Sequence, residues 1–301
     1  MTASRSRYEL LHKRVRLFTR MLHGVEEGRA RAVHRTRVAA RRLREVLPVQ
    51  QLDSGVARRL GRRLRRVTRR LGVVRELDAL LTLVDGMRLS GRYDEVALSR
   101  VVGAMAQERA TVRARASSKL PGAELERLAA KLERIAKGLM GDASGRAATR
   151  GWRWAIDARV RHRAEALKEA VDAAGNVYLA GRVHAVRIRL KKFRYAVELK
   201  GEVSPEQASG RDLASLKRAQ ELLGRLHDRQ MLMDRVRQTQ ASLTPPNLPL
   251  WRALDGLLTS LEKECRRLHA RYVRDAAGLL ALCDRIAGRA PDDAPVRRRA
   301  V

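Results

Sequence analysis

Two histidine-led runs of basic residues are the part of this sequence that could do chemistry. Residues 33–44 read VHRTRVAARRLR, and residues 183–194 read VHAVRIRLKKFR. The runs lie 150 positions apart, and Val, His and two arginines are identical between them. A guanidinium donates two parallel hydrogen bonds to a phosphate, a lysine acts as a point charge, and a histidine adds a further donor. The chemistry that these residue types indicate is therefore anion binding.

The spacing of the cations predicts that each run forms one helix with a narrow cationic stripe. At 100° per residue, Arg37, Arg41 and Arg44 fall about 60°, 20° and 80° to one side of His34. The apolar residues fall on a neighbouring, wider arc, which predicts a face that packs into a core. The second run repeats the spacing of the stripe with His184, Arg187, Lys191 and Arg194.

A second basic segment follows each run. Residues 58–70 hold eight arginines in thirteen positions and no carboxylate. Its Leu-Gly ending at residues 71–72 precedes Arg75-Glu76, and the same order returns 152 positions later, where residues 223–224 precede His227-Asp228. Two blocks in the same order at nearly equal offsets indicate duplication of a helical unit, with chance similarity in an arginine-rich chain as the alternative.

Like charges at helical spacing repel one another, and no acidic residue between Glu27 and Glu45 offsets the first stripe. A solvated basic face is the plain interpretation of one such helix, whereas two repeated stripes favour a binding surface. His34 and His184 could contact the anion or could be structural residues that bond Glu76 or Asp228. The candidate polyanion-binding residues are His34, Arg37, Arg41, Arg42, Arg44, Arg62, Arg65, Arg66, Arg69, His184, Arg187, Lys191, Lys192, Arg194, Lys217 and Arg218.

The composition agrees with a polyanion partner. The chain has 301 residues, a formal net charge of +32 and 45% hydrophobic residues, which excludes a disordered chain. Residues 1–150 hold 35 Lys and Arg against 15 Asp and Glu, and residues 151–301 hold 30 against 18, so both halves are basic. Self-repulsion of this size disfavours the compact state, and nucleic acid, an anionic membrane surface or a phosphate polymer would relieve it. An arginine-biased genome is the competing explanation.

The sequence predicts a cytoplasmic protein that does not insert into a membrane. The N-terminus has no apolar stretch typical of a signal peptide, and the longest apolar run, residues 276–283, is too short to span a bilayer. Cys265 and Cys283 lie too far apart on one helix to form a disulfide within it. The spacings of His and Cys indicate no metal site, and nothing indicates a cofactor.

Helical periodicity throughout the chain predicts an all-α fold. The expected helices are 5–26, 29–47, 53–71, 75–88, 93–118, 122–140, 147–173, 177–200, 205–223, 228–241 and 248–287. The Gly-Asp-Ala-Ser-Gly segment 141–145 is the best candidate boundary between units. We therefore expect one helical-bundle repeat over 1–145, a second over 146–290 and a basic tail over 291–301.

At the two histidine helices and the two Leu-Gly-x-x-[basic]-[acidic] segments, which we interpret as turns, the sequence resembles the CHAD family, the conserved histidine α-helical domain. The resemblance covers about residues 5–287. It implies two four-helix-bundle-like repeats related by a pseudo-twofold axis, with a basic groove or pore between them that takes inorganic polyphosphate, and association with polyphosphate bodies. The chain departs from the pattern with Glu76 where Asp is usual, and its second copy has His227 in place of Arg75 and Gln230 in place of Asp78.

Two other functions compete with polyphosphate binding. Catalysis of phosphoryl transfer needs clustered carboxylates for metal, and the sequence shows neither these nor a Gly-x-x-x-x-Gly-Lys loop. The Glu-x-Glu-x-Lys signature of the triphosphatase domain often fused to this family is also missing, so we expect a non-catalytic protein. Non-specific binding of RNA or DNA is the alternative that charge supports, although ten aromatic residues offer few platforms for base stacking.

Overall fold

The structure, a computed structural model, describes residues 7–119, 122–140 and 146–288. Within these residues every regular element is a helix, which confirms the predicted all-α class. The elements are α1 (Arg7–Thr19), α2 (Leu22–Glu26), α3 (Ala30–Val46), the 3-10 helix η1 (Leu47–Val49), α4 (Ser54–Leu89), α5 (Glu95–Lys119), α6 (Gly122–Gly138), α7 (Arg146–Ala174), α8 (Ala180–Val203), the 3-10 helix η2 (Pro205–Gln207), α9 (Gly210–Ala241) and α10 (Leu248–Ala287).

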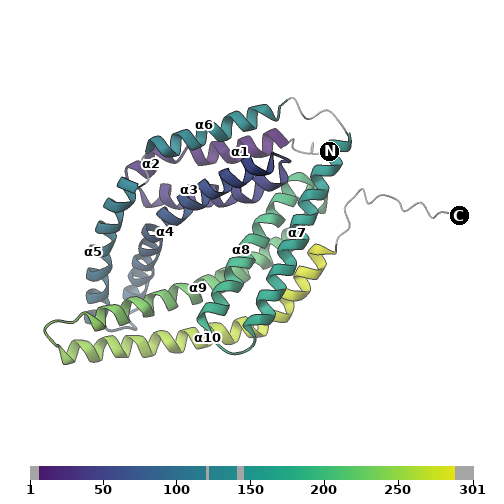
Figure 1. Cartoon of the computed structure of the whole chain (residues 1–301). Coiled ribbons are helices and arrows are strands. Elements are labelled where there is room, and N and C mark those ends of the chain that lie inside the picture. The colour runs from purple at the N-terminus through teal and green to yellow at the C-terminus, as the bar shows by residue number, and fades with distance from the viewer. Residues whose placement is uncertain (1–6, 120–121, 141–145, 289–301) are drawn as a thin grey trace.

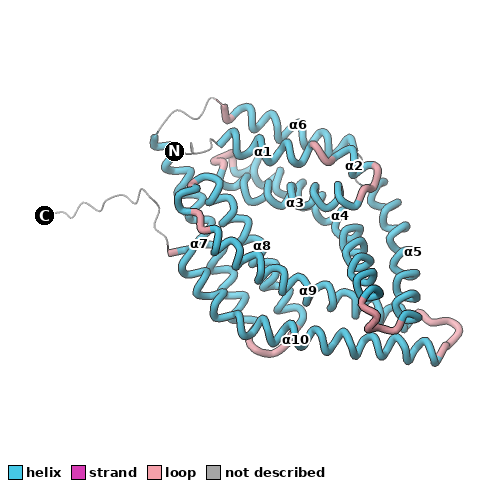
Figure 2. Tube along the Cα trace, turned by 180° about the vertical axis from the view of Figure 1, so that it is seen from behind, coloured by secondary structure: helices cyan, strands magenta, loops and turns pink. Residues whose placement is uncertain are grey.

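The helices are arranged as a ring. Helices α1, α3 and α6 form one side, α4 and α5 the next, the long α9 and α10 the third, and α7 and α8 the fourth (Figure 1). The view from behind shows the same order (Figure 2). Helix α3 contacts α8, and α4 contacts α9, so the two repeated motif regions meet where neighbouring sides of the ring adjoin.

Helices α4 and α9 run without a break through the segments that we expected to be turns at residues 72–74 and 224–227. The prediction of helix ends at 71 and 223 is therefore wrong. A Cβ atom on Gly72 would lie 2.8 Å from Arg37 Nη1, so this glycine admits the guanidinium from α3 against the backbone of α4. The glycine serves a close approach between two helices, and not a turn.

Two other boundaries differ from the predicted ones. The expected helix 5–26 is divided into α1 and α2 by a turn at residues 20–21. Pro205 begins only the short η2, and α9 starts at Gly210, where the Ser209 hydroxyl accepts a hydrogen bond from Asp212 N at 3.2 Å. A serine side chain can satisfy the free N–H groups of a helix start, whereas a proline only tolerates that position.

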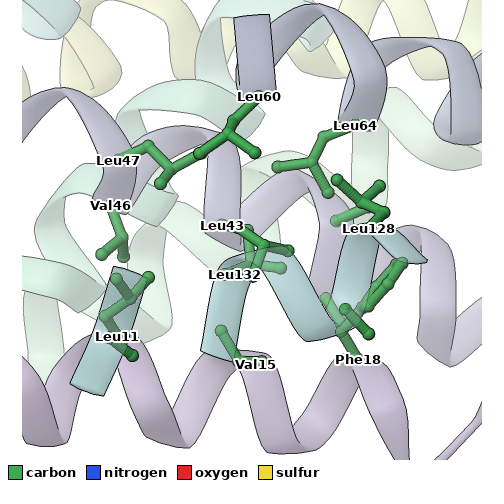
Figure 3. Packing of buried hydrophobic residues seen from close by; sticks show 14 of the residues in the cluster. Leu11, Val15, Phe18, Leu43, Val46, Leu47, Leu60, Leu64, Leu128 and Leu132 are labelled. Atoms are coloured by element: carbon green, nitrogen blue, oxygen red, sulfur yellow. The ribbon is translucent and has the colours of Figure 1, made fainter. Parts of the chain in front are cut away.

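The first core lies between α1, α3, α6 and the first half of α4. Leu11, Val15 and Phe18 of α1 pack against Leu43 of α3 and Leu128 of α6, among other labelled side chains (Figure 3). These five residues are all 3% exposed or less. The apolar spacing that we assigned to a core face in the sequence is thus the face that holds α3 in place, and it leaves the cationic stripe on the other side.

Two further core clusters complete the interior, and the second of them connects the two halves of the chain. One cluster joins α7, α8, the first half of α9 and the second half of α10. Another joins Leu77 and Leu98 from the first half of the sequence to Leu232 and Leu261 from the second, and all four are fully or almost fully buried. The predicted boundary between the two repeats is the segment 141–145. This segment and the expected tail 291–301 lie outside the described residues. The pseudo-twofold relation between the halves stays a prediction.

None of the helices in the described part of the chain combines the length and apolarity needed to cross a membrane. Cys265 and Cys283 are both free and buried.

Candidate functional site

Helices α3, α4, α8 and α9 enclose a cavity of about 610 Å³. Each helix contributes residues from its repeated motif, so the segments that the sequence singled out converge on one place. Ten of the sixteen predicted binding residues line the cavity: His34, Arg37, Arg41, Arg44, Arg65, Arg69, His184, Arg187, Lys191 and Lys192.

Four of these cations face one another from α3 and α8. Helix α3 supplies Arg37 and Arg41, and α8 supplies Arg187 and Lys191. Burial, followed by Arg187, Arg41 and Arg37, lowers the pKa of the Lys191 ammonium to about 7. Burial and the neighbouring Arg41 likewise lower the pKa of Arg37 to about 10. The protein therefore holds these charges in a place where burial and mutual repulsion both disfavour them.

Few protein groups neutralise this cluster. Among the described residues, no carboxylate forms an ion pair with Arg41, Arg187 or Lys191. The Arg187 Nε atom is buried and has no hydrogen-bond partner in the described structure. Arg37 is held by one contact, a hydrogen bond from its Nη1 atom to the carbonyl of Thr68 beside Gly72. A buried donor without an acceptor is uncommon in folded proteins and indicates a place for a ligand or water.

The cavity is cationic in total. Nine Lys and Arg residues line it against three carboxylates, Glu45, Glu76 and Asp228. Glu45 is engaged by α7, because Arg159 Nε and Arg163 Nη2 lie 2.9 and 3.3 Å from its Oε2 atom. Burial raises the pKa of both Glu76 and Asp228. The carboxylates thus offset only part of the positive charge.

The two motif histidines form hydrogen bonds with an arginine and with another histidine, and not with carboxylates. Arg75 Nε donates to His34 Nδ1 at 3.0 Å, which leaves the His34 proton on Nε2. His184 Nδ1 lies 3.3 Å from His227 Nδ1, so one ring donates to the other. The alternative in which His34 and His184 bond Glu76 or Asp228 is therefore wrong. Burial lowers the pKa of both histidines, and burial together with Arg187 lowers that of His227 to about 3.

Six predicted residues lie outside the cavity lining: Arg42, Arg62, Arg66, Arg194, Lys217 and Arg218. Two of them, Arg42 and Arg194, share the Glu198 carboxylate, with Arg42 at 3.1 Å, and Arg194 also donates to Gln220 at 2.8 Å. Arg194 occupies the repeat position of Arg44, which does line the cavity. The position that matches Glu198 in the first repeat is Pro48, so Arg44 has no such carboxylate one turn away.

Sequence reasoning missed Arg75, Glu76, His227 and Asp228 as cavity residues, because they were placed at predicted breaks between helices. On an unbroken α4, Glu76 falls about 20° from Arg65 at 100° per residue, so a continuous helical wheel would have shown it on the cavity face. Asp78 and Gln230, which also differ between the copies, have structural partners instead. Arg109 Nε donates to Asp78 at 2.6 Å, and Tyr178 Oη donates to Gln230 at 2.9 Å.

Comparison with known proteins agrees with this architecture. A family model described as CHAD domain matches residues 9–237. Among curated proteins none matches the chain. A crystal structure of the CHAD domain from the plant Ricinus communis has a TM-score of 0.57 and 21% identity, covering 97% of this chain and 94% of that chain. PptA from Streptomyces chartreusis has a TM-score of 0.56 and 20% identity, covering 94% of this chain and 98% of that chain. At these identities the likeness shows the fold alone.

Proposed function

We propose that this chain, which belongs to the CHAD domain family, binds inorganic polyphosphate in the cavity between α3, α4, α8 and α9. The observation that carries the proposal is the cluster of Arg41, Arg187 and Lys191, which face one another without an ion-paired carboxylate among the described residues. Such an arrangement destabilises the free protein, and a polyanion in the cavity would offset both the repulsion and the burial of charge.

The cavity suits a flexible phosphate polymer better than a nucleic acid. Its cations come from four helices, so a ligand that carries charge along its whole length can contact all of them. Its only aromatic residue in the described structure apart from histidines is Tyr195, which is 7% exposed and offers no face for a base to stack on. Non-specific RNA or DNA binding is the outcome to be distinguished by experiment.

We further propose that binding is non-catalytic. Within the described residues, no group of three or more His, Cys, Asp or Glu is placed so that it could hold a metal ion. Phosphoryl transfer normally relies on such ions to neutralise the developing charge. Association with polyphosphate bodies follows from the same proposal, because a protein that binds polyphosphate would collect where the polymer is concentrated.

A competition assay tests the proposal. Long-chain polyphosphate, single-stranded RNA and duplex DNA, matched in phosphate content, compete for labelled protein at physiological salt, and polyphosphate should win. The logarithm of the affinity should also fall linearly as log salt rises, because bound cations release counterions from the polymer. Preference for RNA or DNA in the competition, or an affinity that salt leaves unchanged, contradicts the proposal.

A matched pair of variants locates the site. Arg41→Gln with Arg187→Gln removes two charges inside the cavity, and Arg271→Gln with Arg274→Gln removes two exposed charges on α10. Both variants have the same net charge, so long-range attraction is equal. The cavity variant should lose most polyphosphate affinity and the α10 variant little. Equal losses would indicate a diffuse basic coat and not a site.

A further inference from the structure

A row of arginines on α4 begins in the cavity and continues outside it. Arg65 and Arg69 line the cavity, and Arg62 and Arg58 precede them by one and two helical turns. At 100° per residue, the four arginines fall within an arc of about 60°, so they share one face of α4. All four are exposed. We call them the α4 row.

The other faces of this segment of α4 are a core face and a flank that also carries the exposed Arg59 and Arg63. Leu60, Leu64 and Val67 are buried in the first core. On the flank of the helix, Arg66 and Arg70 lie 3.7 and 3.6 Å from the Glu124 carboxylate of α6. Arg66 and Arg70 are therefore partly neutralised by the protein itself.

The outer end of the α4 row lacks such neutralisation. Arg58 donates to Ser54 O and Oγ at 3.2 and 3.3 Å, one turn earlier on its own helix. Within the described residues, no carboxylate forms an ion pair with Arg58 or Arg62. Exposed guanidiniums on one face, without acidic partners, are suited to bidentate contacts with successive phosphates.

Helix α9, the repeat counterpart of α4, has no equivalent row. At the offset of 152, Arg58 and Arg62 correspond to Gly210 and Ala214, and Arg69 corresponds to Glu221. Only Arg65 has a basic counterpart, Lys217, which lies outside the cavity lining. The repeat is therefore asymmetric along the helix face on which the α4 row lies.

We infer that a polyphosphate chain longer than the cavity leaves it past Arg65 and Arg69 and continues along α4 over Arg62 and Arg58, and that no such path exists over α9. The inference rests on the proposed function and specifies along which helix the bound polymer leaves the cavity. The α4 row extends the site by about 10 Å beyond Arg65, from the rise of 1.5 Å per residue over the seven residues back to Arg58. Affinity should therefore rise once the chain is long enough to reach the row.

The test uses the full-length protein and two phosphate probes, tripolyphosphate and long-chain polyphosphate, with single-stranded RNA as a third ligand. Arg58→Gln with Arg62→Gln removes the outer end of the row, and Arg271→Gln with Arg274→Gln is the charge-matched control. Because exposed ion pairs are each worth a few tenths to one kcal/mol, the row variant should lose about two- to thirtyfold affinity for the long chain. Its affinity for tripolyphosphate should stay within about twofold of the control.

The outcomes separate this inference from the proposed function. Long-chain affinity equal to that of the control, or equal losses for both probes, overturns the path along α4 while cavity binding stands. RNA binding that depends on the row, with polyphosphate binding that does not, also overturns it. Failure of the unmodified protein to bind either phosphate probe contradicts the proposed function itself.

Discussion

His184 Nδ1 lies 3.3 Å from His227 Nδ1, at the place where the first repeat pairs His34 with Arg75. The same backbone position therefore carries a permanent cation in one copy and a neutral ring in the other, because the pKa of His227 is lowered to about 3. At this position the two repeats therefore differ by about one charge at neutral pH. This difference is open to direct test.

Replacing His227 with arginine should strengthen polyphosphate binding. The new guanidinium would occupy the position that Arg75 holds in the first repeat, and one added contact to a phosphate is worth about two- to tenfold in affinity. His162→Arg on α7 is the matched control, because it adds the same charge at an exposed position that does not line the cavity. Titration calorimetry at pH 8 would measure both, and equal gains would contradict a role for position 227.

The affinity for long-chain polyphosphate should fall as pH rises from 7 to 9. In the free protein the pKa of Lys191 is about 7, so the amine is mostly neutral above that pH. A bound polyanion favours the ammonium form, so binding at pH 8 requires uptake of a proton. Binding isotherms at constant ionic strength would show the fall, and calorimetry in two buffers with different ionisation enthalpies would count the proton.

Lys191→Arg is the control for this pH dependence. An arginine at the position stays protonated throughout this range, so the affinity of the variant should change much less between pH 7 and 9. Two results would exclude Lys191 as the source of the pH dependence. One is an unmodified protein whose affinity is constant from pH 7 to 9, and the other is a Lys191→Arg variant whose affinity falls with pH as steeply as that of the unmodified protein.

Lys191→Met should stabilise the free protein and weaken binding at the same time. The pKa of Lys191 is about 7 in the fold and about 10.4 in an unfolded chain, so the unfolded state binds more protons between these values. The lysine therefore costs stability, fully below pH 7 and not at all above about pH 10.4. At pH 7 an apolar side chain of similar size should raise the free energy of unfolding by about 1 to 3 kcal/mol. Urea unfolding would measure the change, and a variant less stable than the unmodified protein would contradict it.

Neither half of the chain should bind as the whole does. Residues 1–145 alone would expose Leu77 and Leu98, and residues 146–301 alone would expose Leu232 and Leu261, which form one shared cluster. Each fragment should therefore unfold with low cooperativity, and mixing the two should restore part of the affinity. One fragment that binds long-chain polyphosphate as tightly as the intact chain would refute the shared site.

The sequence predicted the helical class and the stripes on α3 and α8 because both follow from the spacing of apolar and charged residues along a single helix. It did not predict that α4 and α9 are continuous, because Gly72 is a helix breaker by propensity and only its contact with Arg37 shows why it is there. The exclusion of Arg194 from the cavity could not be foreseen from its stripe either. That outcome depends on Glu198 one turn away and on Gln220 from another helix.

The unbroken course of α4 and α9 has a consequence for how affinity can change in evolution or in the laboratory. Each helix carries cavity residues in its middle, directly beside leucines of the shared cluster: Leu80 also lines the cavity, and Leu232 follows the lining residue Met231. We expect a change in the volume of those leucines to shift α4 and α9 relative to each other and so to alter the width of the cavity that they share with α3 and α8. We therefore expect some substitutions that change the affinity for polyphosphate to lie in the interior of the protein. A mutational scan of surface charges would not include those residues.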